Sequence, residues 1–409
     1  MSLQFKKILP YIISLLVGIL LSWKSMTYHF EHESLLNYLH LGFQLIVAAA
    51  LPFIIIYFRK DFTYAKMKEF IILSFYLVLA FCIGLNVNHV VRNWDWHYVI
   101  LTILPLAFFP IGKILGGRIN DKILSVCILI SLLFLAELSF IHMLFQGFIY
   151  GNIKGSVSLY PTVVDVVQFP FFRAFIRPVG VTSSPHSSAT LMAAIFCYAV
   201  FQIFFYRRKM TSAIRVSLSL LAFFSGATLI LSLVGQGMLA AILGMCMILF
   251  FLPWQIKTKI LITLPAIGLI SFIVYFREIG GPWKYFFEII TSLSEKKAQD
   301  LILILAIGEG SINARNFLTG EIFLLCMPFT IGLIPFIIIS KMIVQCVNEN
   351  TKNLTEWNFR HYLIIIPVVL VFGSLHYNSI FIYPNNAIFF FILGLLYLPV
   401  GHKENKPNC

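Results

Sequence analysis

The chain has 409 residues, of which 59% are hydrophobic and 11% charged, and its formal net charge is +13. This composition excludes an ordinary soluble protein, and the apolar runs leave no room for a separate soluble domain. The basic residues lie in short segments between apolar runs rather than on one amphipathic face, which argues against a nucleic-acid partner. We therefore predict an all-α, polytopic integral membrane bundle that forms one transmembrane domain, residues 1–409.

The apolar runs predict about 12 transmembrane helices. Most Lys and Arg of the short connections fall on one side if the N-terminus is inside, so the positive-inside rule predicts that both termini are cytoplasmic. No small-x-small cleavage site follows the first run, which we read as an uncleaved helix. The predicted spans are 8–22, 35–58, 69–88, 97–112, 123–146, 183–206, 213–232, 236–253, 260–276, 318–340, 361–378 and 384–400.

Glu137 is the one carboxylate deep inside a predicted span. A buried carboxylate without a partner is costly in a membrane, so we expect Glu137 to face the bundle interior and to be neutral or paired. It either holds helices together or binds a polar substrate such as a sugar. A proton-coupled transporter would need such a group as well.

Two long polar loops interrupt the apolar pattern, residues 147–182 and 277–317, and the predicted topology places both outside. In the first loop, Arg173 and Arg177 share one face if their segment is helical. Paired guanidinium groups can bind a pyrophosphate, but they can equally anchor an interfacial segment. Both loops are short enough to fold back on the bundle as re-entrant or interfacial helices.

The second loop carries Arg277 at its start and Arg315 near its end. Glu321 follows at the beginning of the next span, beside Gly320. Its carboxylate either activates an acceptor hydroxyl or caps the helix N-terminus.

Three segments carry a family resemblance. They are Arg177-Pro-Val-Gly-Val-Thr-Ser-Ser-Pro-His186, Leu231-Ser-Leu-Val-Gly-Gln-Gly-Met-Leu-Ala240 and Phe372-Gly-Ser-Leu-His-Tyr-Asn378. Together they resemble the O-antigen polymerase (Wzy) family, within the wider O-antigen polymerase and ligase group. Ser184 and His186 replace two asparagines of the family pattern, and Gln236 replaces an arginine that is common in ligases. Gly235 and Gly237 are also explained by a tight turn between two spans, and Ser187 or Ser188 by a helix cap.

The resemblance implies transfer of a growing glycan from undecaprenyl pyrophosphate onto a lipid-linked oligosaccharide repeat unit, at the periplasmic face of the bacterial inner membrane. It implies a separate chain-length regulator as partner, besides membrane lipid. The donor is already activated, so no cofactor is expected, and no metal motif is found. The implied roles are acceptor activation by His376, His186 or Glu321, pyrophosphate binding by Arg173, Arg177, Arg277 and Arg315, and glycan binding by Tyr377, Asn378 and Glu137.

Two alternatives remain open. An O-antigen ligase is disfavoured by Gln236 and by the missing asparagines. A lipid-linked oligosaccharide flippase, or another transporter, is expected to have shorter outer loops and charges spread through a central cavity. The two histidines also have a simpler explanation as interfacial hydrogen-bonding residues.

Overall fold

Nearly all of the described part of the chain is helical. The computed structural model describes residues 64–87, 104–118, 121–144, 166–169, 172–176, 185–206, 210–232, 234–251, 298–307, 327–328, 331–352, 362–374, 380–381 and 385–397, with scattered positions at 42 and between 257 and 291. The helices are α3 (Tyr64–Val87), the short 3-10 helix η1 (Leu104–Ala107), α5 (Phe108–Arg118), α6 (Asp121–Leu144), α8 (Pro185–Tyr206), α9 (Ser212–Leu231), α10 (Gly235–Phe251), α13 (Ala298–Ile307), α16 (Leu333–Lys352), α18 (Ile365–Gly373) and α19 (Asn385–Leu396).

Four helices of the described part are long and apolar enough to cross a membrane. They cover Leu124–Ile141, His186–Phe204, Ser212–Leu231 and Leu333–Asn350. Their outward surfaces carry large exposed apolar side chains, such as Ile130 on α6 and Phe223 on α9. An apolar exterior is what lipid requires, so the chain is a helical membrane protein. The twelve spans and the cytoplasmic termini extend beyond the described residues and stay predictions.

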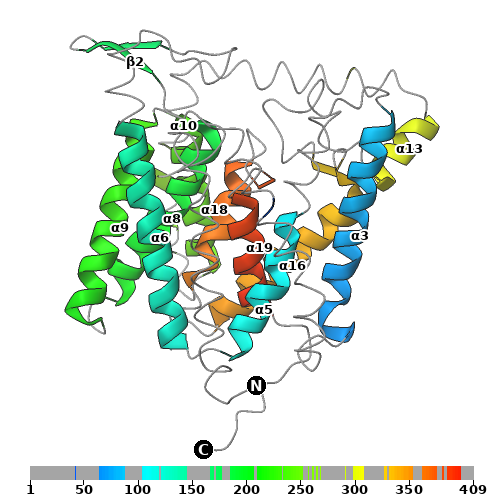
Figure 1. Ribbon diagram of the computed structural model, residues 1–409, viewed down its shortest axis with the longest axis horizontal. Coiled ribbons are helices and arrows are strands. Elements are labelled where there is room, and N and C mark those ends of the chain that lie inside the picture. The colour runs from blue at the N-terminus through cyan, green and yellow to red at the C-terminus, as the bar shows by residue number, and fades with distance from the viewer. Residues whose placement is uncertain are drawn as a thin grey trace, which may run out of the picture.

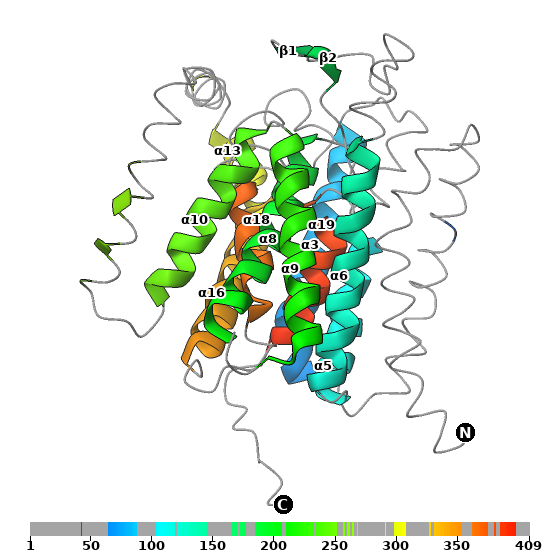
Figure 2. The same cartoon turned by 90° about the vertical axis from the view of Figure 1, so that its left-hand side faces the viewer.

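Helix α8 lies at the centre of the described bundle. It packs against α9, α10 and α18, while α6 covers the other side of α9 (Figures 1 and 2). Its side chains between Leu191 and Ala199 are all buried except that of Phe196. A helix that is apolar all round is typical of such a central position. Helices α5 and α19 form a second tightly packed pair, and α18 joins the two groups.

Two helices extend past their predicted ends. We placed the ends of two spans at 112 and 340, just before Lys113 and Lys341, but α5 continues to Arg118 and α16 to Lys352. Lysine does not end a helix, because its aliphatic stem can run along apolar surface to a polar partner. The ammonium group of Lys113 lies 5.4 Å from the centre of the Tyr397 ring. It also donates a hydrogen bond to the backbone oxygen of that residue.

The first long loop contains a β-hairpin, whereas a shared face of Arg173 and Arg177 would require helix there. Strand β1 (Val166–Phe169) pairs antiparallel with β2 (Phe172–Ile176), with Val166 opposite Ile176. The hairpin lies beyond the ends of the helices (Figure 1). Valine and phenylalanine favour strands, and proline at position 170 is unsuitable inside a helix. The helical reading of the Arg173 segment is therefore wrong.

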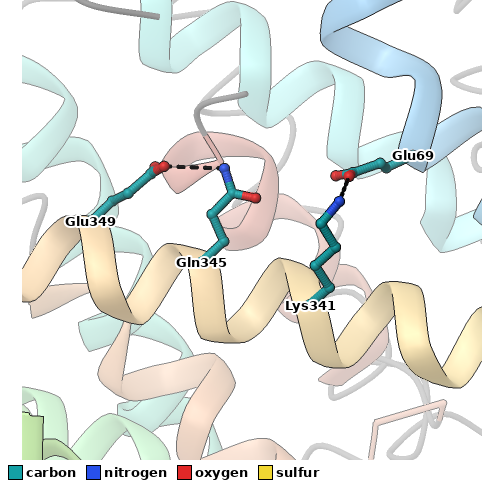
Figure 3. A network of polar contacts seen from close by, with 4 residues as sticks. All are labelled: Glu69, Lys341, Gln345 and Glu349. Carbon is teal, nitrogen blue, oxygen red and sulfur yellow. Dashed lines mark hydrogen bonds and ion pairs between the residues drawn. The ribbon is translucent and has the colours of Figure 1, made fainter. Parts of the chain in front are cut away.

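A polar contact joins α3 to α16. Lys341 of α16 forms an ion pair with Glu69 of α3, and Gln345 donates to Glu349 one turn further along α16 at 3.1 Å (Figure 3). The three α16 residues are spaced four apart, so they share one face of that helix. The contact holds the N-terminal part of α3 beside the middle of α16.

Candidate functional site

Four helix ends that are distant in sequence meet at one place. They are the N-termini of α8, α10 and α19 and the C-terminus of α18, and side-chain hydrogen bonds join them. Three of the four ends belong to the segments that carry the family resemblance. The packing of α8 against both α10 and α18 brings these segments together.

Gln236 connects two of these ends to α8. Its Oε1 lies 3.0 Å from Nδ1 of His186, in the first turn of α8. Its Nε2 donates a hydrogen bond to the backbone oxygen of Gly373, at the end of α18. The Gln236 side chain is buried, with 8% of its surface exposed, while His186 is half-buried. Because the last carbonyl groups of a helix have no partner within it, the amide of Gln236 satisfies an otherwise unpaired acceptor.

Glycines let these helices approach closely. A Cβ atom on Gly237 would lie 2.8 Å from the backbone oxygen of Ala189, and one on Gly373 would collide with the side chain of Thr190. Gly235 begins α10 and Gly237 lies inside it, so they do not form the turn between two spans. The structure thus assigns Gly237 to close packing of α10 on the first turn of α8.

Asn385 ties α19 to the same turn of α8. Its Nδ2 donates to the backbone oxygen of Ser187 at 3.0 Å, and the whole residue is buried. Within the described part of the chain, three buried atoms here have no hydrogen-bond partner: Oδ1 of Asn385 and the hydroxyl groups of Ser187 and Ser188. Both serines follow Pro185, which opens α8, so neither is the helix cap that we expected. Buried polar atoms without a partner require an explanation, such as a bound water molecule or ion.

The loop after α18 starts and ends beside this site. The hydroxyl of Ser374 donates to the backbone oxygen of Leu370 at 3.2 Å and accepts from the backbone N–H of Ile380 at 3.1 Å. His376, Tyr377 and Asn378 belong to this loop but lie outside the described residues. The bond between Ser374 and Ile380 therefore holds both flanks of their segment close to Gly373.

Three of the four helix ends at the site are N-termini, and the described residues named here include no Asp, Glu, Lys or Arg. The N-termini of three helices meet there, and the partial positive charge of each helix dipole lies at its N-terminus. Converging N-termini are a common setting for phosphate groups. The arrangement thus combines an imidazole, which can move a proton near neutral pH, with a setting that attracts an anion.

Glu137 does not face the bundle interior, as we had expected. It is exposed on α6, whereas its neighbours Ala136 and Ser139 are buried. It lies on the same outward face as the exposed apolar side chains of Phe134 and Ile141, because these positions are three or four residues apart. The structure therefore does not place Glu137 among the residues around His186.

The other predicted site residues are described only in part or not at all. For Arg173 the structure gives the backbone position, in β2. Arg177, Arg277, Arg315 and Glu321 lie outside the described residues, so their roles stay predictions. A possible metal site was not expected, and no group of three potential ligands occurs in the part that the structure describes.

Sequence reasoning missed two residues of this site, Gln236 and Asn385. Gln236 was noticed as a departure from the ligase pattern, without a role of its own. A polar amide at the apolar start of a predicted span was the available signal in both cases. Neither a scan against protein-family models nor a search of curated protein sequences gives a match to this chain.

Proposed function

We propose that the chain is an O-antigen polymerase of the bacterial inner membrane. It transfers a growing glycan from undecaprenyl pyrophosphate onto the terminal sugar of another lipid-linked repeat unit, at the periplasmic face. One observation carries this proposal: the segments on which the resemblance rests are distant in sequence, yet Gln236 connects His186 of the first to Gly373 of the third. A common reaction site explains why these segments lie together.

The reaction needs a base for the acceptor and an anion site for the donor. The base takes the proton of the acceptor hydroxyl, whose oxygen forms the new bond to the anomeric carbon of the donor. The bond from that carbon to the pyrophosphate breaks, and undecaprenyl pyrophosphate leaves with the bonding electrons. Interactions that stabilise the growing negative charge lower the barrier, which is the task we give to the helix N-termini and to the arginines of the two long loops.

Two histidines compete for the role of base. His186 is held at the site by Gln236. His376 is two residues from Ser374, and consecutive Cα atoms are 3.8 Å apart, so its Cα lies within about 8 Å of that of Ser374. We propose that the site contains both imidazoles.

Deletion of the gene in its native host tests the function. We expect a lipopolysaccharide gel to show collapse of the long ladder to core plus one repeat unit, and restoration of the gene to restore the ladder. Loss of all O antigen with lipid-linked polymer in the periplasm would instead identify a ligase. Repeat units trapped at the cytoplasmic face would identify a flippase, and an unchanged ladder would overturn the proposal.

The arginines of the loops are expected to contribute strongly. Arg177→Ala and Arg315→Ala should each lower the rate of polymerisation on the order of 100-fold, as expected for losing one group that stabilises the transition-state charge. The measurement is the ladder length at matched amounts of protein in the membrane. Arg215→Ala is the matched control. Arg215 lies in the first turn of α9, and the other end of that helix, at Ser232, leads into the segment that carries Gln236. Full-length polymer from both test variants would exclude the arginine clamp.

A further inference from the structure

The orientation of the Gln236 amide has a chemical consequence for His186. A backbone carbonyl can only accept hydrogen bonds, so the group of Gln236 that contacts the oxygen of Gly373 must be its NH2. The amide oxygen then necessarily faces Nδ1 of His186, at 3.0 Å. An amide oxygen can only accept, and Nδ1 must therefore carry a hydrogen.

A neutral imidazole has one N–H and one unprotonated nitrogen. If Nδ1 carries the hydrogen, the lone pair that can take a proton is on Nε2. We propose that Gln236 is a positioning residue that holds His186 in this tautomer, so that Nε2 is the atom that removes the proton from the acceptor hydroxyl. The identity of the acceptor rests on the proposed function. The tautomer of His186 is argued from the contacts of Gln236 alone and does not depend on that function.

The surroundings make this orientation of Gln236 hard to change. The side chain is 8% exposed, and rotating the amide by half a turn would place its oxygen against the oxygen of Gly373. Two facing acceptors in a buried place are unfavourable, because neither can satisfy the other. Gly373 packs directly against the side chain of Thr190. Thr190 in turn donates to the backbone oxygen of His186 at 2.9 Å.

The test is 15N NMR of the full-length protein labelled in its histidines and reconstituted in lipid. Spectra are recorded at roughly pH 8.5, where a histidine of ordinary pKa is neutral. Comparison with His186→Gln identifies the signals of His186. We expect Nδ1 to show the shift of a protonated nitrogen and Nε2 that of an unprotonated one. The opposite assignment in the wild-type protein would overturn the proposal.

Two variants then separate positioning from packing. Gln236→Leu has a similar volume but no acceptor, so we expect the Nδ1–H tautomer to lose its dominance and the rate of polymerisation to fall at least 10-fold. Gln236→Glu keeps an acceptor toward Nδ1 but loses the donor to Gly373, so we expect it to preserve the Nδ1–H tautomer while weakening the contact with α18. If Gln236→Leu does not fold, the spectra of the wild-type protein and of Gln236→Glu still show which nitrogen of His186 carries the hydrogen. An unchanged tautomer in folded Gln236→Leu would contradict the proposal.

The outcome is distinguishable from failure of the proposed function. If deletion of the gene leaves the ladder unchanged, the polymerase proposal fails, whatever the NMR result. If the ladder collapses on deletion but His186 carries its hydrogen on Nε2, the polymerase proposal stands and the positioning role of Gln236 fails.

Discussion

Replacing Gly112 or Gly394 by valine is expected to prevent the protein from accumulating in a folded form. These glycines lie where α5 and α19 cross, and each faces the backbone of the other helix. A Cβ atom on Gly112 would collide with the backbone oxygen of Phe391, and one on Gly394 with that of Phe109. Small residues at such crossings allow the close approach that holds membrane helices together.

The clash involves backbone atoms, so no change of rotamer can relieve it. Overpacking a protein core typically costs about 1–3 kcal/mol, and we expect the upper end or more here because the two helices must separate. The α5–α19 contact also includes Phe109, which stacks on Phe70 of α3 at 4.3 Å between ring centres. Separation of α5 from α19 would therefore disturb the contact with α3 as well.

Size-exclusion chromatography of the detergent-solubilised variants measures this effect. Gly112→Val and Gly394→Val should give aggregated or degraded protein. Gly268→Val is the matched control, since a Cβ at that glycine meets nothing within 4 Å. Gly244→Val should be intermediate, because a Cβ there would meet a side-chain atom of Val369 at 2.5 Å rather than a backbone oxygen. A normal elution profile for Gly112→Val would contradict the packing that we describe.

The positions of the helices were predictable because lipid imposes a simple rule. Every backbone polar group in a membrane needs an internal partner, so each long apolar run must be a helix. Predicted spans such as 123–146 and 213–232 differ from α6 and α9 by at most two residues at each end. The hairpin of the first long loop was missed because that rule does not apply outside the membrane.

The site was only partly predictable, since its contacts join residues that are far apart in sequence. His186 was proposed from its motif, but its partner Gln236 is 50 residues away and the partner of Gln236 is 137 residues further. Only the packing of three helices brings them together. The orientation of Glu137 was predicted from its cost of burial, whereas the structure shows it on an exposed face of α6 that also carries apolar residues three and four positions away.

Replacing His186 by alanine is expected to abolish the long ladder. Loss of a general base typically lowers a rate 100- to 10,000-fold, roughly 3–5 kcal/mol in the barrier. Alanine also removes the partner of the Gln236 amide oxygen, so a loss of activity from this variant alone would not separate chemistry from packing. His186→Gln can still donate a hydrogen bond from its side chain to Gln236, but it cannot take up a proton at neutral pH.

The two His186 variants, compared with His376→Gln, therefore decide which histidine is the base. If His186 is the base, both variants fold normally and neither makes polymer, because proton removal is lost in each. Thr211→Ala is the control for a general loss of stability: Thr211 caps the N-terminus of α9, and removing such a cap costs about 1 kcal/mol without touching the site. A normal ladder from His186→Gln, with none from His376→Gln, would transfer the role of base to His376 and leave His186 a structural partner of Gln236.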